Sequence, residues 1–224
     1  MYYEPGVTRH GLPYDPFKSC VVPRPIGWIS TLDANGVANL APYSQFQNIT
    51  FDPPIVMFSA NQTMAGARKD TTVNVEREGS FVWNMATYDL REAVNRSAEA
   101  VPPEVDEFAY AGLEKAPSRL VRPWRVAASP VQFECEYLQT VRLPGKGVVG
   151  TVDVVFGRVV AVHIADDALT ADGKLDIVRL RPLARLGYYD YTYVDKTFSM
   201  RVGDADNPGL EGSPEKVAAA LAKN

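Results

Sequence analysis

The sequence has few of the residues on which metal binding and nucleophilic catalysis usually depend. Its two cysteines are Cys20 and Cys135, and its two histidines are His10 and His163. The cysteines do not form a C-x-x-C pair, and so few sulfur and imidazole ligands argue against a zinc site. We interpret both cysteines as reduced thiols, and no metal is expected.

Several motifs of common enzyme classes are also missing. The sequence contains no G-x-S-x-G elbow, no G-x-x-x-x-G-K-[ST] loop and no G-x-G-x-x-G turn. These motifs expose a nucleophilic serine, cradle phosphates, and open a dinucleotide-binding unit, respectively. The sequence therefore offers no support for a serine hydrolase, a P-loop protein or a Rossmann fold.

Excess positive charge and long apolar runs are absent as well. The formal net charge is −4, which argues against a broad nucleic-acid surface. The longest apolar stretch, residues 159–164, is interrupted by His163 and is far too short to cross a bilayer. The N-terminus shows no basic segment followed by an apolar one. We expect a cytoplasmic protein without a nucleic-acid or membrane partner.

What is present is an ordinary globular composition. The 224 residues are 46% hydrophobic and 22% charged, so the chain can bury a core without disulfides. We divide it into an N-terminal arm (1–20), one domain (21–203) and a C-terminal tail (204–224) with a short helix after Ser213.

Strand patterns dominate the domain. The sequence predicts helices over 70–78, with Asp70 or Thr71 as the cap and Gly79 as the stop, and over 90–98 and 104–110. No regular βα alternation occurs, which favours a nearly closed antiparallel barrel with peripheral helices. Pro42 marks a sheet edge or a bulge, because proline cannot donate to a ladder. Strands are predicted over 26–31, 37–43, 55–59, 81–85, 131–138 and 148–164.

Two segments could hold a ligand. Arg68 and Lys69 lie where a helix begins, an arrangement that the helix dipole disfavours and that a bound phosphate would repair. The alternative is a solvated helix start. The segment from Asn39 to Ser44 leaves a strand with small and amide-bearing residues, so a planar ligand could lie against its backbone. The alternative there is a plain strand end.

These segments belong to a wider pattern. Together they resemble the flavin reductase-like, FMN-binding split-barrel family over roughly residues 15–200. The residues that carry the resemblance are Pro23-Arg24-Pro25-Ile26-Gly27-Trp28-Ile29-Ser30-Thr31, Gly36, Asn39-Leu40-Ala41-Pro42-Tyr43-Ser44, Asp52-Pro53-Pro54, Lys69-Asp70-Thr71 with Asn74, Phe81-Val82-Trp83-Asn84, and Arg181-Pro182-Leu183-Ala184-Arg185-Leu186-Gly187.

The resemblance implies a mainly β fold, a six-stranded antiparallel split barrel with peripheral helices. It further implies a homodimer that binds FMN at or near the subunit interface and takes hydride from NADH or NADPH. Flavin supplies the redox chemistry, so no catalytic side chain is required. Carried over by position, the segment Asn39, Leu40, Ala41, Pro42, Tyr43 and Ser44 contacts the isoalloxazine and ribityl groups, and Ser30 and Thr31 lie beside the flavin. Arg68, Lys69 and Thr71, with Asp70 among them, take the phosphate. An N–H donor or a cation near the ring would stabilise the reduced flavin, and the candidates are Arg185 and backbone amides.

The pattern departs from the family at three positions. Gly27 stands where alanine is more usual, Tyr43 where phenylalanine is more usual, and Trp83 where a smaller residue is common.

The first hypothesis for the function is an NAD(P)H-dependent flavin reductase, for which a separate monooxygenase is a candidate partner. The alternative is an FMN or haem carrier without nicotinamide turnover.

Other aromatic and imidazole groups have simpler interpretations. We interpret His163 as a satisfied residue of the barrel wall, although it could instead place a nicotinamide or donate a proton. Trp28 and Trp124 are expected in the core. For some of the tyrosines at 188, 189, 191 and 193 we expect a dimer interface.

Overall fold

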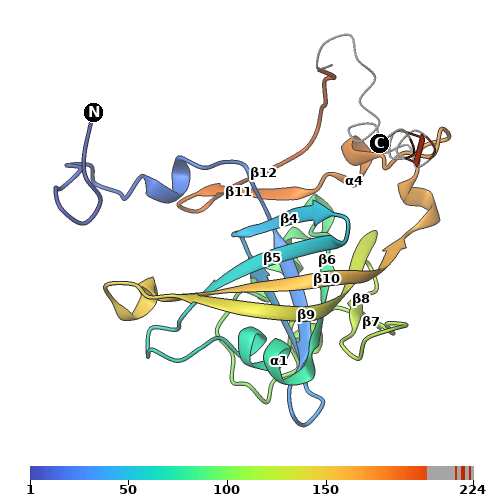
Figure 1. The fold of residues 1–224 in the computed structure, drawn as a ribbon, viewed down its shortest axis with the longest axis horizontal. Helices are drawn as coiled ribbons and strands as arrows, with labels where there is room; N and C mark the ends of the chain where they lie inside the picture. The colour runs from blue at the N-terminus through green and yellow to red at the C-terminus, as the bar shows by residue number, and fades with distance from the viewer. Residues whose placement is uncertain (201–214, 216–217, 220–221, 223–224) are drawn as a thin grey trace.

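Strand-forming segments build one seven-stranded antiparallel sheet that curves into a split barrel (Figure 1). The computed structural model describes residues 1–200 together with residues 215, 218, 219 and 222. In spatial order the strands are β3 (Ala38–Tyr43), β2 (Gly27–Leu32), β6 (Ser80–Asn84), β9 (Val131–Leu143), β10 (Val152–Ile164), β5 (Pro54–Asn61) and β4 (Phe46–Phe51).

The mainly β split barrel is confirmed, and the six predicted strands are all present. The seventh strand of the sheet, β4, was not predicted. In β4 only Phe46 is buried, and the following residues are exposed or half-buried without alternation. A segment with one buried side chain gives no period-two signal, so the sequence did not reveal it.

Smaller strand pairings flank the barrel. A three-stranded sheet of β1 (Arg24–Pro25), β11 (Leu183–Gly187) and β12 (Asp190–Tyr193) lies beside β4, together with the N-terminal arm (Figure 1). The short strands β7 (Lys115–Ala116) and β8 (Arg125–Val126) pair with each other.

The helices lie close to their predicted places. Helix α1 (Asp70–Glu78) ends at Gly79, whose φ of +73° is the left-handed conformation that glycine tolerates. Its cap is Lys69 rather than Asp70 or Thr71, and the Lys69 side chain makes no capping hydrogen bond. The predicted helix after Ser213 lies mostly outside the described residues. The other helices are α2 (Arg91–Arg96), α3 (Glu107–Ala111) and α4 (Ile177–Leu180), with 3₁₀ turns at Phe17–Ser19, Tyr88–Leu90, Val148–Gly150 and Asp166–Ala168.

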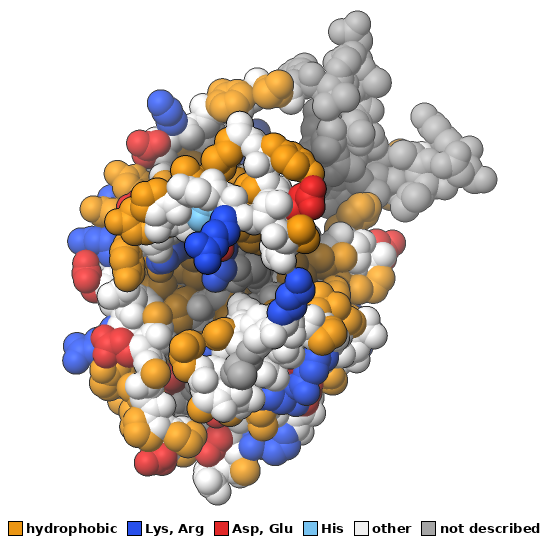
Figure 2. All heavy atoms as spheres, turned by 90° about the vertical axis from the view of Figure 1, so that its left-hand side faces the viewer, with side chains coloured by type: hydrophobic (Ala, Val, Ile, Leu, Met, Phe, Trp, Pro, Cys, Tyr) orange, Lys and Arg blue, Asp and Glu red, His pale blue; other side chains and the backbone are white. Residues whose placement is uncertain are grey.

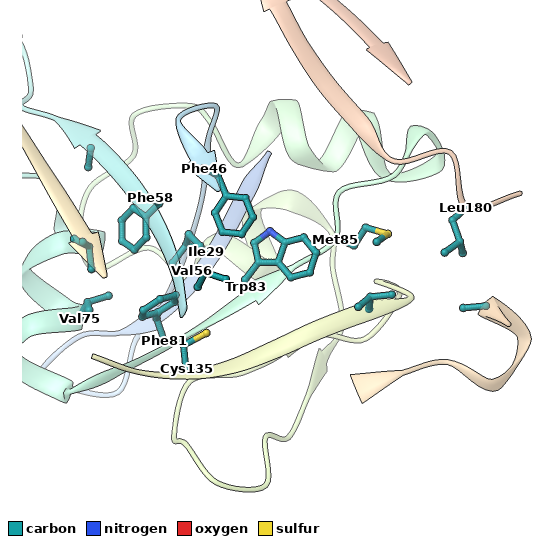
Figure 3. Close-up of a cluster of buried hydrophobic side chains, with 14 residues drawn as sticks. Ile29, Phe46, Val56, Phe58, Val75, Phe81, Trp83, Met85, Cys135 and Leu180 are labelled. Atoms are coloured by element: carbon teal, nitrogen blue, oxygen red, sulfur yellow. The ribbon is translucent and has the colours of Figure 1, made fainter. Parts of the chain in front are cut away.

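Apolar side chains pack on both faces of the sheet. One cluster fills the barrel, where Phe58, Phe81 and Cys135 are fully buried (Figure 3). The other lies between the outer face and the helices, where Trp28 is fully buried and Trp124 packs against it. Trp28 is therefore in the core, as predicted, whereas Trp124 is half-buried at its margin.

Two departures from the family pattern, Gly27 and Trp83, meet in one packing arrangement. The Phe46 ring is stacked on the Trp83 ring, with centroids 5.4 Å apart and planes 2° from parallel (Figure 3). A Cβ on Gly27 would come within 2.8 Å of a Phe46 ring carbon. The glycine therefore makes room for the phenylalanine, which in turn covers the large indole.

Candidate functional site

Strand β3 forms one edge of the seven-stranded sheet, at the seam of the barrel. The backbone amide of Leu40 points away from β2 and donates to the Glu107 carboxylate. Along an antiparallel strand, alternate residues turn their backbone groups to the same side. Pro42 therefore also faces the open edge, where its missing N–H costs no ladder bond. The edge interpretation of Pro42 is confirmed.

At its first residues β3 meets the start of helix α1. The Thr71 hydroxyl donates to Asn39 Oδ1 at 2.7 Å, and the Thr31 hydroxyl donates to the same oxygen at 3.1 Å. The Asn39 amide group donates to Glu107 Oε2 at 2.7 Å, and Asn74 donates to the Thr31 hydroxyl at 3.2 Å. Three predicted site residues thus converge, and α3 contributes a carboxylate that the sequence did not indicate.

This network contains unusual acid–base groups. Burial raises the pKa of Glu107 to about 7, against the opposing effect of the Leu40 amide. Burial also raises the pKa of the Tyr43 phenol, and the Thr71 hydroxyl partly counters this. The Tyr43 side chain packs against the cluster inside the barrel, with its ring centroid 5.1 Å from that of Phe58, and its phenol stays protonated at neutral pH.

Arg68 has a different partner from the predicted phosphate. Its guanidinium donates to both Glu76 oxygens, at 2.6 and 2.7 Å, and its Nε donates to Asp153 at 2.8 Å. Asp153 is only 2% exposed, so Arg68 compensates a buried charge in the barrel wall. Of the two cations predicted to hold a phosphate at the helix start, Arg68 is therefore paired within the protein, and Lys69 makes no ion pair among the described residues.

The rest of the helix start is only partly accessible. Lys69 and Asp70 are exposed, and Thr71 and Thr72 are buried. The Thr72 hydroxyl is buried and has no hydrogen-bond partner within the described part of the chain. A cation, the first amides of the helix and a spare hydroxyl are donors that suit a phosphate group.

At its last residues β3 borders a cavity of about 520 Å³. Three predicted site residues line it, namely Pro42, Ser44 and Arg185. Arg185 donates to the Tyr188 carbonyl, and its guanidinium lies 4.5 Å from the centre of the Tyr191 ring. The sequence brought these three residues together only through the resemblance, since 141 positions separate Ser44 from Arg185.

The N-terminal arm supplies another wall of this cavity. Lys18 and Arg24 add positive charge to the lining, and the Ser19 hydroxyl and Arg24 Nε are buried without a partner among the described residues. The sequence did not indicate Lys18 and Ser19, and it indicated Arg24 only as one of the residues that carry the family resemblance. Figure 2 views the molecule from the side of the arm, where the surface is hollowed and carries Lys and Arg next to hydrophobic side chains.

Ser30 lies with its side chain on the outer face of the sheet, and its place beside the flavin stays a prediction. Its hydroxyl donates to the Trp124 carbonyl at 2.5 Å, on the outer face of the sheet. Leu40 buries its side chain in the outer apolar cluster, so only its backbone can meet a ligand, and Ala41 is half-buried. Every residue of β2 is buried because both faces of the strand are covered. The burial pattern therefore does not separate the two faces.

Within residues 1–200, no helix is long and apolar enough to cross a membrane. The described residues also contain no group of three or more side chains arranged to hold a metal ion.

The comparisons with known proteins identify the family to which this split barrel belongs. Residues 19–196 match the profile of the "Flavin reductase like domain". The chain therefore belongs to the flavin reductase-like family. A protein of Halalkalibacterium halodurans described as uncharacterized is 38% identical over 180 residues, which cover 80% of this chain and 86% of that protein.

Solved structures share the fold. Nitrilotriacetate monooxygenase component B from Bacillus cereus has a TM-score of 0.81 and 28% identity, covering 89% of this chain and 98% of its own. The 2-nitrobenzoate 2-nitroreductase of Pseudomonas fluorescens has a TM-score of 0.78 and 22% identity, covering 91% and 97%. The second likeness concerns the fold alone.

Proposed function

We propose that this protein binds FMN along the open edge of β3 and reduces it with hydride from NADH or NADPH. The observation that carries the proposal is the position of β3. One end of the strand meets a helix start with a free lysine, and the other end meets a cavity lined by Arg185. Five steps along an extended chain, from Asn39 to Ser44, span about 16 Å. This is the scale of an extended FMN molecule.

The phosphate would lie at the start of α1. Lys69 supplies the charge, and the amides of the first turn and the Thr72 hydroxyl supply further donors. Thr71 already donates to Asn39, and Arg68 is paired with carboxylates, so we assign both to shaping the site rather than to the phosphate itself.

The ring system would lie toward the cavity. The open-edge backbone groups of β3 can pair with the polar edge of a flavin, and Arg185 can stabilise negative charge on it. The cavity volume of about 520 Å³ is typical of small-molecule sites. When bound, FMN supplies the hydride-accepting chemistry, and the protein holds it, orients it and leaves a face for the nicotinamide.

The assembly and its partners are also proposals. Tyr189 is 95% exposed, and Tyr188 and Tyr191 on the same ribbon are exposed as well. Together with exposed Phe17 on the arm they form an apolar surface that suits a second copy of the chain. The Bacillus cereus structure is named as component B of a monooxygenase. We propose that a separate monooxygenase receives reduced flavin from this protein, in the cytoplasm.

Anaerobic spectroscopy tests the proposed function. The purified protein is first titrated with FMN, and NADH or NADPH is then added without oxygen. We expect FMN to bind, and its absorbance near 450 nm to bleach faster with the protein than without it, on the order of 100-fold or more. Binding without accelerated bleaching by either nicotinamide would favour the carrier alternative. Failure to bind FMN would refute the proposal.

A further inference from the structure

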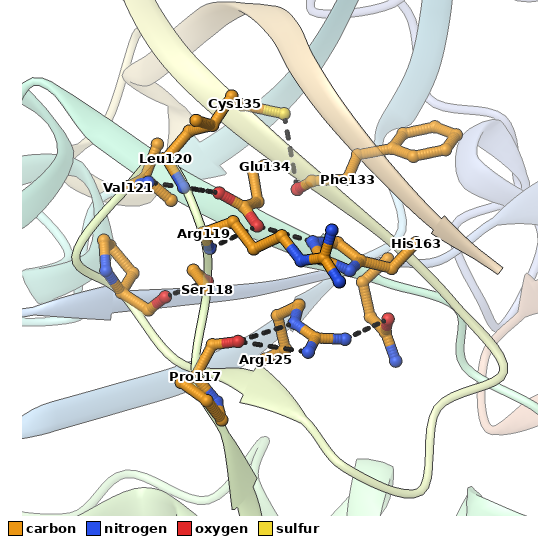
Figure 4. Close-up of polar contacts among 12 residues, drawn as sticks. Pro117, Ser118, Arg119, Leu120, Val121, Arg125, Phe133, Glu134, Cys135 and His163 are labelled. Carbon is orange, nitrogen blue, oxygen red and sulfur yellow. Dashed lines mark hydrogen bonds and ion pairs between the residues drawn. The ribbon is translucent and has the colours of Figure 1, made fainter. Parts of the chain in front are cut away.

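A polar cluster on the outer face of the sheet is separate from the β3 edge. Glu134 on β9 is fully buried, and its carboxylate accepts backbone amides from Arg119, Leu120 and Val121 at 2.8, 2.6 and 3.1 Å (Figure 4). His163 on β10 contacts the same carboxylate, with Nε2 2.5 Å from Oε1. The histidine is thus satisfied within the strand, as interpreted from the sequence.

The charge of Glu134 is already compensated within this cluster. Burial would raise the pKa of Glu134, but the backbone amides and His163 hold it below its ordinary range. The carboxylate therefore stays ionised, accepts hydrogen bonds from the loop amides and contacts the imidazole. It is not a partner for the arginine side chains that surround it.

Two arginines lie beside this cluster without a carboxylate partner of their own in the described residues. Arg125 donates to the Pro117 carbonyl at 3.1 and 3.0 Å and to Gln132 at 3.0 Å, which are neutral acceptors. Arg119 makes no side-chain hydrogen bond or ion pair among the described residues. Burial lowers the pKa of Arg125, the nearby Glu134 opposes this, and the neighbouring Arg119 adds to it.

A cavity of about 430 Å³ lies in front of these groups. Arg119, Arg125 and His163 all line it, and Figure 4 shows the two guanidinium groups on the side of the imidazole. Ser129 and Gln132 add further polar groups. The lining residues differ from all those of the cavity at β3.

We propose that this outer cavity is a second ligand site, which binds a small organic molecule through a carboxylate or phosphate group. The Arg119 guanidinium offers a planar fork of donors that fits an oxyanion, and Arg125 keeps two of its five N–H groups beyond its three hydrogen bonds. Such charge-assisted bonds are stronger than neutral ones. The cavity volume leaves room for a molecule larger than the anion alone. The site is independent of the proposed flavin site, because no lining residue is shared.

Binding of two probes tests the proposal. Pyrophosphate and citrate, which represent the phosphate and carboxylate sources, are titrated at low ionic strength by calorimetry. We expect saturable binding of at least one probe, and the stronger probe identifies the source. Arg119→Gln should weaken that binding about tenfold or more, because one charge-assisted contact is lost.

Two matched controls make the test specific. Arg122→Gln removes an arginine of the same loop that is paired with Glu78, and it should leave the affinity within about twofold. Lys69→Gln removes the cation of the proposed flavin site, so any probe binding that this variant abolishes and Arg119→Gln leaves intact belongs to helix α1 and not to the outer cavity.

Three outcomes would overturn the proposal. These are no saturable binding of either probe, equal weakening by Arg119→Gln and Arg122→Gln, and weakening by Lys69→Gln alone, which would place the anion at helix α1. Unchanged circular dichroism and thermal midpoint of Arg119→Gln exclude misfolding as the cause. FMN binding by the same variant is measured in parallel, so failure of the second site and failure of the flavin site are distinguishable.

Discussion

Glu107 and Asn39 are joined by a hydrogen bond of 2.7 Å, and the same carboxylate oxygen holds the backbone amide of Leu40. This contact fixes the strand proposed to carry the flavin through a single buried acid on α3. Burial raises the pKa of Glu107 to about 7, because its effect outweighs that of the two hydrogen-bond donors, which favour the ionised carboxylate.

The raised pKa of Glu107 makes stability depend on pH. The folded state holds the proton more tightly than the unfolded state, so Glu107 favours folding at low pH. This contribution is lost as the pH rises from about 4.5 to about 7. Glu107→Gln removes the titration, so wild type should lose stability relative to the variant between pH 5 and 8, on the order of 2 kcal/mol. Urea unfolding at both pH values measures this. A difference that does not change with pH would contradict it.

Arg68 should be a determinant of stability. Arg68→Met leaves Asp153 with Arg142 alone and Glu76 without its bidentate partner. We expect a loss of about 1–3 kcal/mol in unfolding free energy at pH 7. Both acids have lowered pKa values in the folded state, so this loss should shrink as the pH falls below about 4. The control is Arg158→Met, which breaks an exposed pair with Glu136 and should cost much less. A cost equal to that control would refute the assignment.

A Lys69 variant should show whether this lysine contacts the phosphate or the ring system of the flavin. If it contacts the FMN phosphate, Lys69→Gln should weaken FMN binding about tenfold or more and leave riboflavin binding unchanged. Fluorescence quenching of the two flavins measures both affinities. Ser30→Ala is the matched control, because this hydroxyl faces Trp124 and should not affect either ligand. Equal weakening of FMN and riboflavin by Lys69→Gln would place the lysine away from the phosphate.

The space above Gly27 should be needed by Phe46. Gly27→Ala places a Cβ within 2.8 Å of the Phe46 ring, and we expect it to destabilise the fold by about 1–3 kcal/mol. The double variant with Phe46→Leu should recover part of that loss, so the two changes should not be additive. Thermal midpoints of the two single variants and the double variant measure the coupling. Additive losses of stability would show that contact with Phe46 is not the reason why alanine at position 27 destabilises the fold.

Much of the fold could be predicted because its signals are local. The six predicted strands depend on apolar content and alternation, and α1 depends on Gly79 directly after a helical segment. Strand β4 gave no such signal, because it buries only Phe46. The proline at position 42 was informative because a missing donor limits the places it can occupy.

The candidate site was harder to predict because its partners come from distant segments. Arg68 and Asp153 lie 85 positions apart, so the ion pair that removes this cation from the helix start has no local signature. Glu107 was missed for the same reason, because its partners Asn39 and Leu40 lie in a distant segment. The direction of Ser30 was hidden because β2 is covered on both faces.

The loop over residues 117–126 has a consequence for any attempt to remodel this protein. Polar side chains of the sheet form hydrogen bonds with this loop. Its backbone bonds to Ser30 on β2, Asn84 on β6 and Glu134 on β9, and its Arg125 side chain bonds to Gln132 on β9. Side chains of three neighbouring strands therefore fix the conformation of one loop through hydrogen bonds. A loop grafted from a relative would seat only if these polar residues were transferred with it, so loop and sheet are expected to be exchangeable as a unit and not separately.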